Sequence, residues 1–242
     1  RMAGLVPDAV VVVATVRALK MHGGLPKTAL AEENIPALEA GIPNLLRHVG
    51  NIREVYGLPC VVAVNRFPTD TDAEIDFIVK KCRELGVNTV LSTVWAEGGK
   101  GGEALAREVV RLCEEEKGNF TFSYDDGLSL SEKIESVVKK VYHGDGVNIL
   151  PAAKKQLEKL EALGFGGCPV CIAKTQYSFS DDPAKLGAPT DFTVTVRNVR
   201  IAAGAGFVIV LTGDIMTMPG LPKIPAAEKI DVDENGRITG LF

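Results

Sequence analysis

The chain has 242 residues, of which 46% are hydrophobic, with a net charge of −4 and a pI near 5.5. This length and apolar content suit one large or two small domains, and the acidic balance disfavours a nucleic-acid-binding protein, which usually carries a basic stripe. Because no apolar run approaches the roughly 20 residues that span a bilayer and the first residues do not form a signal peptide, we expect a cytoplasmic protein with no membrane partner.

The first half of the sequence alternates apolar runs with segments of helical spacing. The apolar runs predict strands at 9–16, 60–64 and 89–94. We expect the first run, which is rich in valine, to be covered on both faces. The segments of helical spacing predict helices at 37–56, 70–85 and 103–115. Pro43 lies inside the first of these and predicts a helix break or a helix start there, whereas Thr69 or Asp70 is the expected cap of the second.

The character of the chain changes near Gly118. Beyond it, helices are predicted at 130–141 and 151–163, and strands at 148–150, 170–174, 192–199 and 206–211. Asp233–Gly236 has the composition of a hairpin turn. The β-α-β-α-β-α order of the first half predicts a doubly wound, mostly parallel α/β sheet in residues 1–118. A smaller α/β domain is expected in residues 119–242.

The five cysteines predict no metal site. Cys60, Cys82 and Cys113 fall in apolar patterns and are expected to be small buried hydrophobic residues. Cys168 and Cys171 have C-x-x-C spacing, which also fits a redox pair or half of a zinc site. Because there is no second C-x-x-C pair and no nearby histidine pair, a four-ligand zinc set is hard to assemble. The alternative is the start of a buried strand.

Two aromatic residues follow predicted strands. Phe67 comes just after the second strand, and Trp95, the single tryptophan, just after the third. The tips of neighbouring strands are about 5 Å apart, or twice that if one strand intervenes. A flat heterocycle between two rings needs a similar spacing, so the pair can form an aromatic clamp. The alternative is that both are ordinary core residues.

Two further features adjoin these strand ends. Asn65 ends the second strand, where its amide offers both a donor and an acceptor to the edge of a purine or pterin ring, or else closes a turn. The glycine-rich segment Glu97–Gly102 precedes a helix, whose N-terminus favours an anion. It is not a Walker A loop, because Lys100 is followed by glycine, and it is equally compatible with a flexible loop.

A cationic cluster follows the first predicted strand. Arg17, Lys20 and His22 precede Gly23 and Gly24, which let the backbone turn and approach a neighbour closely. In open α/β sheets, ligands gather outside the carboxyl ends of the strands, so we expect a site here. The alternative is a set of solvated loop charges. Later in the chain, Lys174 ends a strand and either reaches a cleft shared with the first half or serves a structural role.

Four segments resemble signatures of the formate–tetrahydrofolate ligases: 13–24, 63–67, 94–101 and 216–222. The resemblance covers essentially the whole chain but only about the C-terminal half of the family's length. It implies part of a P-loop-NTPase-like sheet, with the phosphate-binding loop in a missing N-terminal half; no Gly-x-x-x-x-Gly-Lys-Ser/Thr occurs here. We therefore expect the chain alone to be inactive.

The resemblance also implies roles for individual residues. The folate-binding positions are Phe67, Trp95, Asn65, Leu91 and Glu97, with the pterin ring of tetrahydrofolate between the two aromatic rings. The nucleotide- or anion-binding positions are Gly23, Gly24, Gly98, Gly99 and Lys100. Catalytic roles fall to Arg17, Lys20 and His22, which would stabilise charge as formyl phosphate forms from formate and ATP.

The implied partners are formate, tetrahydrofolate, ATP with Mg²⁺, and a monovalent activator, K⁺ or NH₄⁺, in a cytoplasmic homotetramer. Two other classes of protein remain open. A silent folate- or nucleotide-binding module would bind pterin without cleaving ATP, and an assembly domain would bind no ligand. An assembly domain gives no reason to place Phe67 and Trp95 at neighbouring strand tips facing one cleft.

Overall fold

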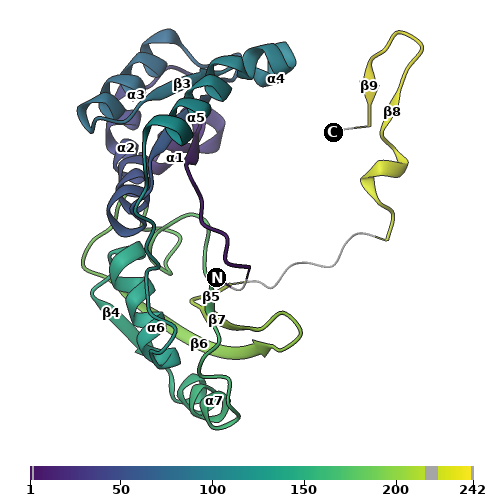
Figure 1. Ribbon diagram of the computed structural model, residues 1–242. Coiled ribbons are helices and arrows are strands. Elements are labelled where there is room, and N and C mark those ends of the chain that lie inside the picture. The colour runs from purple at the N-terminus through teal and green to yellow at the C-terminus, as the bar shows by residue number, and fades with distance from the viewer. Residues whose placement is uncertain (2, 216–222, 241–242) are drawn as a thin grey trace.

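The computed structural model describes residue 1, residues 3–215 and residues 223–240 (Figure 1). Three sheets form within this part of the chain, and the two larger ones each have their own helices and core. The motif at 216–222 lies outside the described residues. The expected boundary at residue 118 stays a prediction, although the two sheets do fall on either side of it.

The first sheet is parallel, with the strand order β1-β2-β3. Its strands are β1 (Val10–Ala14), β2 (Cys60–Asn65) and β3 (Thr89–Ser92). Its helices are α1 (Val16–His22), α2 (Ile35–Gly50), α3 (Asp72–Glu84), α4 (Val94–Glu97) and α5 (Glu103–Glu115). Short 3₁₀ turns cover Lys27–Ala29 and Gly98–Gly102, and a π-helical turn covers Asn51–Val55. The predicted α/β class with parallel strands is confirmed.

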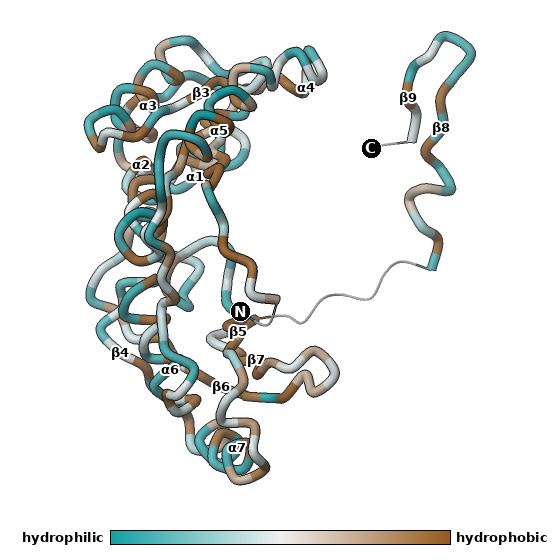
Figure 2. Tube along the Cα trace, viewed as in Figure 1, coloured by the Kyte–Doolittle hydropathy of each residue, from teal (hydrophilic) through white to brown (hydrophobic). Residues whose placement is uncertain are grey.

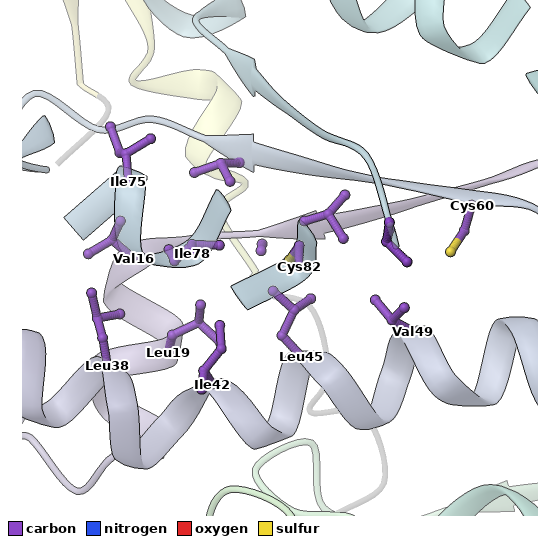
Figure 3. Packing of buried hydrophobic residues seen from close by; sticks show 14 residues of the cluster. Val16, Leu19, Leu38, Ile42, Leu45, Val49, Cys60, Ile75, Ile78 and Cys82 are labelled. Carbon is purple, nitrogen blue, oxygen red and sulfur yellow. The ribbon is translucent and has the colours of Figure 1, made fainter. Parts of the chain in front are cut away.

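The core of this unit lies between the sheet and three helices. Leu38, Ile42, Leu45 and Val49 line one side of α2 and point toward α1, α3 and the strands (Figure 3). From β2, alternate residues enter this core. The intervening residues face α5 on the other side of the sheet. The alternation of teal and brown along α3 and α5 in Figure 2 reflects the amphipathic spacing that predicted them.

The valine run predicted that strand β1 is covered on both faces, and this prediction is wrong. Val11 is 38% exposed and Val13 is 65% exposed, while Ala14 is buried. β1 is an edge strand, paired only with β2 among the described strands, and α5 covers β2 and β3 rather than β1. The β-branched run therefore predicted the strand correctly, but it did not predict which faces of the strand are buried.

Three predicted elements differ in their bounds. The first strand ends at Ala14, because Thr15 caps α1 by accepting the Ala18 N–H at 3.1 Å, so the cationic cluster lies on a helix and not on a loop. The expected break or start at Pro43 is wrong: α2 continues through it, held by the apolar face that packs into the core. The third strand ends at Ser92 and a helical turn follows.

Gly23 has a packing role that its sequence context only partly indicated. A Cβ atom at this position would lie 1.9 Å from the carbonyl oxygen of Ala37 on α2. The close approach expected of the glycine pair is therefore made to the chain's own helix. The neighbouring Gly24 has φ +88, a left-handed conformation that favours glycine, and completes the turn after α1.

Replacing Gly23 by alanine is expected to destabilise the chain by about 1–3 kcal/mol, since α1 and α2 must separate to admit the methyl group. Chemical denaturation of both proteins measures this change. Gly50→Ala is the matched control, because a Cβ there meets nothing within 4 Å and a helical alanine is favoured over glycine by up to about 1 kcal/mol. Equal effects of the two substitutions would contradict the close-packing role.

The second sheet is mixed, with the order β4-β6-β7-β5. Its strands are β4 (Gly146–Ile149), β5 (Val170–Ala173), β6 (Thr193–Ala202) and β7 (Phe207–Thr212). Helices α6 (Leu130–Val137) and α7 (Pro151–Ala162) pack on it. The predicted helix at 130–141 is α-helical only to Val137 and continues as a π-helical turn at Val138–Tyr142. A 3₁₀ turn at Ala226–Glu228 precedes an exposed hairpin of β8 (Asp231–Val232) and β9 (Ile238–Thr239), at the predicted turn.

The cysteines follow the sequence prediction in part. Cys60 and Cys82 are buried, as expected, but Cys113 is exposed on α5 because it falls on the solvent side of that helix. Cys168 lies just before β5 and is half-buried, Cys171 lies on β5 and is exposed, and both are free thiols. The predicted strand is confirmed, but the expectation that it is buried is wrong.

Candidate functional site

A pocket of about 270 Å³ opens beyond the carboxyl ends of β2 and β3. Because these strands are hydrogen-bonded neighbours, the segments that follow them meet at one edge of the sheet. Its lining residues are Arg66, Phe67, Pro68, Thr93, Trp95, Ala96 and Glu97. The structure thus brings together Phe67, Trp95 and Glu97, three of the residues that the sequence had grouped as folate-binding.

Phe67 is held by a tight turn after β2. The Phe67 N–H donates to Asp70 Oδ2 at 2.8 Å, and the Asp70 N–H donates to the Phe67 carbonyl at 3.0 Å. Burial raises the pKa of the Asp70 carboxyl, an effect that the hydrogen bond from Phe67 opposes. Asp70 is therefore a positioning residue for the aromatic ring and is not the expected helix cap, a role that Thr71 takes through a capping box with Glu74.

Trp95 lies on α4, one residue beyond the start of this short helix. Its side chain is 74% exposed, so it is not a core residue. The turn that carries it is closed by two contacts of Thr93: its N–H donates to the Gly101 carbonyl at 3.1 Å, and its hydroxyl donates to Glu97 Oε2 at 2.8 Å. A Cβ at Gly101 would lie 2.5 Å from the Thr93 carbonyl carbon. Part of the glycine-rich segment therefore serves to position the tryptophan.

The other predicted anion-binding positions of this segment are open to solvent. Gly98, Gly99 and Lys100 lie on the 3₁₀ turn after Glu97, and a Cβ at Gly98 or Gly99 would meet nothing within 4 Å. Helix α5 begins directly after this turn, and no side chain caps its first N–H groups. The role of these three residues stays a prediction.

Arg17 is the residue of the cationic cluster that adjoins the pocket. Its guanidinium carbon lies 4.9 Å from the centroid of the Phe67 ring, and its Nη2 donates to the Thr69 hydroxyl at 3.1 Å. Its Nε is buried and has no hydrogen-bond partner among the described residues. One donor of this side chain is therefore unsatisfied, beside the aromatic wall of the pocket.

Lys20 points into the interior instead. Its Nζ donates to Glu74 Oε1 and to the Glu32 carbonyl, both at 2.8 Å, and the Lys20 and Glu74 side chains are 0% exposed. Burial alone would raise the pKa of Glu74, but hydrogen bonds from Lys20 and from the N–H groups of Asn34 and Thr71 outweigh it and lower that pKa. The ion pair joins α1 to α3, and the structure does not place Lys20 at the pocket.

His22, at the end of α1, belongs to a second cavity. Its Nδ1 accepts the Gly187 N–H at 3.2 Å, and burial lowers the pKa of its imidazole. Helical geometry separates only His22 from the other two, because Arg17 and Lys20 are three residues apart and lie on neighbouring positions of α1. Arg17 and Lys20 are separated by their partners, Thr69 and Phe67 for Arg17 and Glu74 for Lys20. The structure does not bring these three residues to one site.

Two remaining predicted residues lie near the pocket without lining it. Asn65 ends β2 opposite Ser92 and is half-buried. Leu91, on β3, packs against the first core. Sequence reasoning missed Arg66, Pro68, Thr93 and Ala96 as lining residues; their adjacency to Phe67 and Trp95 was the signal that could have identified them.

The described part of the chain gathers no group of three or more His, Cys, Asp or Glu side chains suited to a metal ion. No helix within the described residues has the length and apolarity that crossing a membrane requires.

Compared with models of known protein families, the sequence matches, over residues 1–242, the model described as formate–tetrahydrofolate ligase.

Proposed function

Since the chain belongs to the formate–tetrahydrofolate ligase family, we propose that the pocket between Phe67 and Trp95 holds the pterin ring of tetrahydrofolate. The family joins formate to tetrahydrofolate and uses ATP. The observation that carries this proposal is the exposure of Trp95, which lines the pocket together with Phe67. A stacked ring would cover apolar surface that the chain leaves in water.

The size and polarity of the pocket support a ring as its occupant. Its 270 Å³ lies just below the range of about 300–1,000 Å³ typical of small-molecule sites, so it suits the flat part of a larger ligand. Glu97 and Arg66 add an acceptor and donors at the rim, where the edge of a pterin presents both kinds of group. Asn65 and Leu91 do not line this pocket, and their contact with the ligand stays a prediction.

The proposed reaction has two steps. A formate oxygen attacks the γ-phosphorus of ATP and the bond to ADP breaks, which gives formyl phosphate. The N10 amine of tetrahydrofolate then attacks the formyl carbon, the C–O bond to phosphate breaks, and N10 loses a proton. Both steps develop negative charge on phosphoryl oxygens, which a nearby guanidinium stabilises. We assign this role to Arg17, because its guanidinium adjoins the Phe67 ring.

The chain is proposed to supply the folate wall and one side of the nucleotide cleft. The triphosphate cradle, for which no Gly-x-x-x-x-Gly-Lys-Ser/Thr segment is present here, is assigned to a preceding segment of the same enzyme. Gly98, Gly99 and Lys100 are proposed to contact an anionic part of the ligands at the start of α5. ATP with Mg²⁺, a monovalent cation, a cytoplasmic location and a homotetramer complete the proposal.

Tetrahydrofolate is expected to quench the fluorescence of Trp95, the single tryptophan of the chain, in a saturable way. Phe67→Ala is expected to weaken binding by about ten-fold or more, which corresponds to about 1.4 kcal/mol, because it removes one face of the stack. A fluorescence titration of both proteins measures the dissociation constants.

The matched control is Phe122→Ala, which removes an exposed phenylalanine whose ring packs edge-to-face on Phe120 instead of lining this pocket. It is expected to leave the titration unchanged. Quenching that Phe67→Ala does not alter would remove Phe67 from the site. A response to ATP without one to tetrahydrofolate would reassign the pocket to the nucleotide.

A further inference from the structure

A second cavity, of about 210 Å³, lies where the two sheet-containing units meet. Helices α1 and α2 of the first unit contribute His22, Asn44 and His48, and the second unit contributes Tyr142 and Lys174. The α2 side of the first unit faces the second unit in Figure 1. Two contacts to Gly187 join the walls: its N–H donates to His22 Nδ1 at 3.2 Å, and its carbonyl accepts from Asn44 Nδ2 at 2.9 Å.

Lys174 follows β5 and brings a partly buried cation into this cavity. Its Nζ donates to the carbonyls of Thr175, at 2.9 Å, and of Ser178, which leaves one of its three N–H groups. None of the ion pairs in the described part of the chain involves Lys174. The nearby carboxylate of Asp181 accepts the Thr195 N–H at 2.8 Å instead. Burial lowers the pKa of Lys174 to about 8, which Asp181 opposes only in part.

Both histidines of the cavity can donate to a ligand. Because His22 Nδ1 accepts a hydrogen bond, the proton of the neutral ring sits on Nε2. The His48 ring rests on Phe179 with 4.5 Å between the ring centroids, and neither of its nitrogens has a hydrogen-bond partner among the described residues. Burial lowers the pKa of both rings, and for His48 the charges of His22 and Lys174 lower it further.

We propose that this cavity binds a small oxyanion, a phosphate or a carboxylate, between Lys174, His22 and His48. The described residues that line it include no acidic side chain, so its charged groups are all cations or potential cations. The volume is below the range of about 300–1,000 Å³ seen for sites of larger organic ligands. A bound anion would give the free N–H of Lys174 a charged acceptor and would favour the protonated form of both rings.

Such a site would link the two units, because its donors come from both. An anion held by His22 and His48 on one side and Lys174 on the other adds to the two Gly187 contacts across the same boundary. This inference does not depend on the folate pocket, which has no lining residue in common with this cavity.

The histidine side-chain NMR spectrum of the chain tests the proposal directly, because the sequence has only three histidines. Inorganic phosphate and formate are titrated separately at constant ionic strength. We expect a saturable shift of the His22 and His48 signals and a rise of about 0.5 or more in their pKa values. His143 is not a lining residue, although its Nε2 is hydrogen-bonded at 2.7 Å to Oδ1 of the lining residue Asn51, and its pKa is expected to rise less than those of His22 and His48. The anion that saturates at the lower concentration identifies the source.

Lys174→Met is expected to weaken the saturable response at least ten-fold, whereas Lys80→Met, at an exposed position of α3, leaves it unchanged. If Lys174→Met does not fold, His48→Gln replaces it, since that side chain is more exposed and Gln removes the titratable ring. An absence of saturation with both anions, equal pKa rises in all three histidines, or an unaltered response in the folded variant would each overturn the proposal.

Discussion

Replacing Lys20 by methionine is expected to lower the free energy of unfolding by about 3–5 kcal/mol, because it leaves the buried carboxylate of Glu74 without its counter-charge. Both side chains are fully buried, so water cannot take the place of the ammonium group. Glu74 would keep its hydrogen bonds from Asn34 and Thr71, but these N–H groups carry no net charge. Urea denaturation of the wild-type and variant chains measures the difference.

Two control proteins separate this pair from an ordinary ion pair. Lys81→Met breaks a partly exposed pair with Glu84 on the same helix, α3, and is expected to cost about 1 kcal/mol or less. The double variant Lys20→Met, Glu74→Gln removes both charges and retains an acceptor, and is expected to recover about 0.5–3 kcal/mol of the loss. A Lys20→Met cost as small as that of Lys81→Met would contradict the structural role assigned to Lys20.

The sequence predicted the strands and most helices because their apolar spacing is local. The neighbouring strands β2 and β3 end at one sheet edge, and this brings Phe67 and Trp95 together as their positions after the strands had indicated. The first valine run shows the limit of such reasoning. Its composition reports that a strand forms, but coverage depends on where α5 packs, a property of the whole unit.

Long-range pairing explains what the sequence could not predict about the charged residues. Lys20 and Glu74 are 54 residues apart, and no local pattern joins them. His22 meets Gly187 across 165 residues, so its place in the second cavity depends on the docking of two units. A cluster of cations in sequence was therefore interpreted as one site, whereas long-range partners place its members in three different environments.

Replacing Arg17 by methionine is expected to reduce kcat/KM for formate–tetrahydrofolate ligation by about 100- to 1,000-fold, the usual cost of losing one donor that stabilises charge in the transition state. The change should appear mainly in kcat, because the proposed contact strengthens as charge develops on the phosphoryl oxygens. Steady-state kinetics of the complete ligase that carries this chain measure it, together with Trp95 quenching by tetrahydrofolate. The quenching constant is expected to change little, because the guanidinium packs on the Phe67 ring without forming the pocket wall.

Arg17→Met and Lys20→Met are expected to differ in their effect on stability. Arg17→Met is expected to cost about 1 kcal/mol or less in stability, since it breaks one exposed hydrogen bond, to Thr69, and one cation–π contact. Arg107→Met, which removes an exposed arginine from α5, is the matched control and should leave kcat/KM unchanged. If Arg17→Met instead weakens tetrahydrofolate binding as much as it lowers kcat/KM, the guanidinium acts by positioning Phe67. The charge-stabilising role would then have to be assigned to another cation.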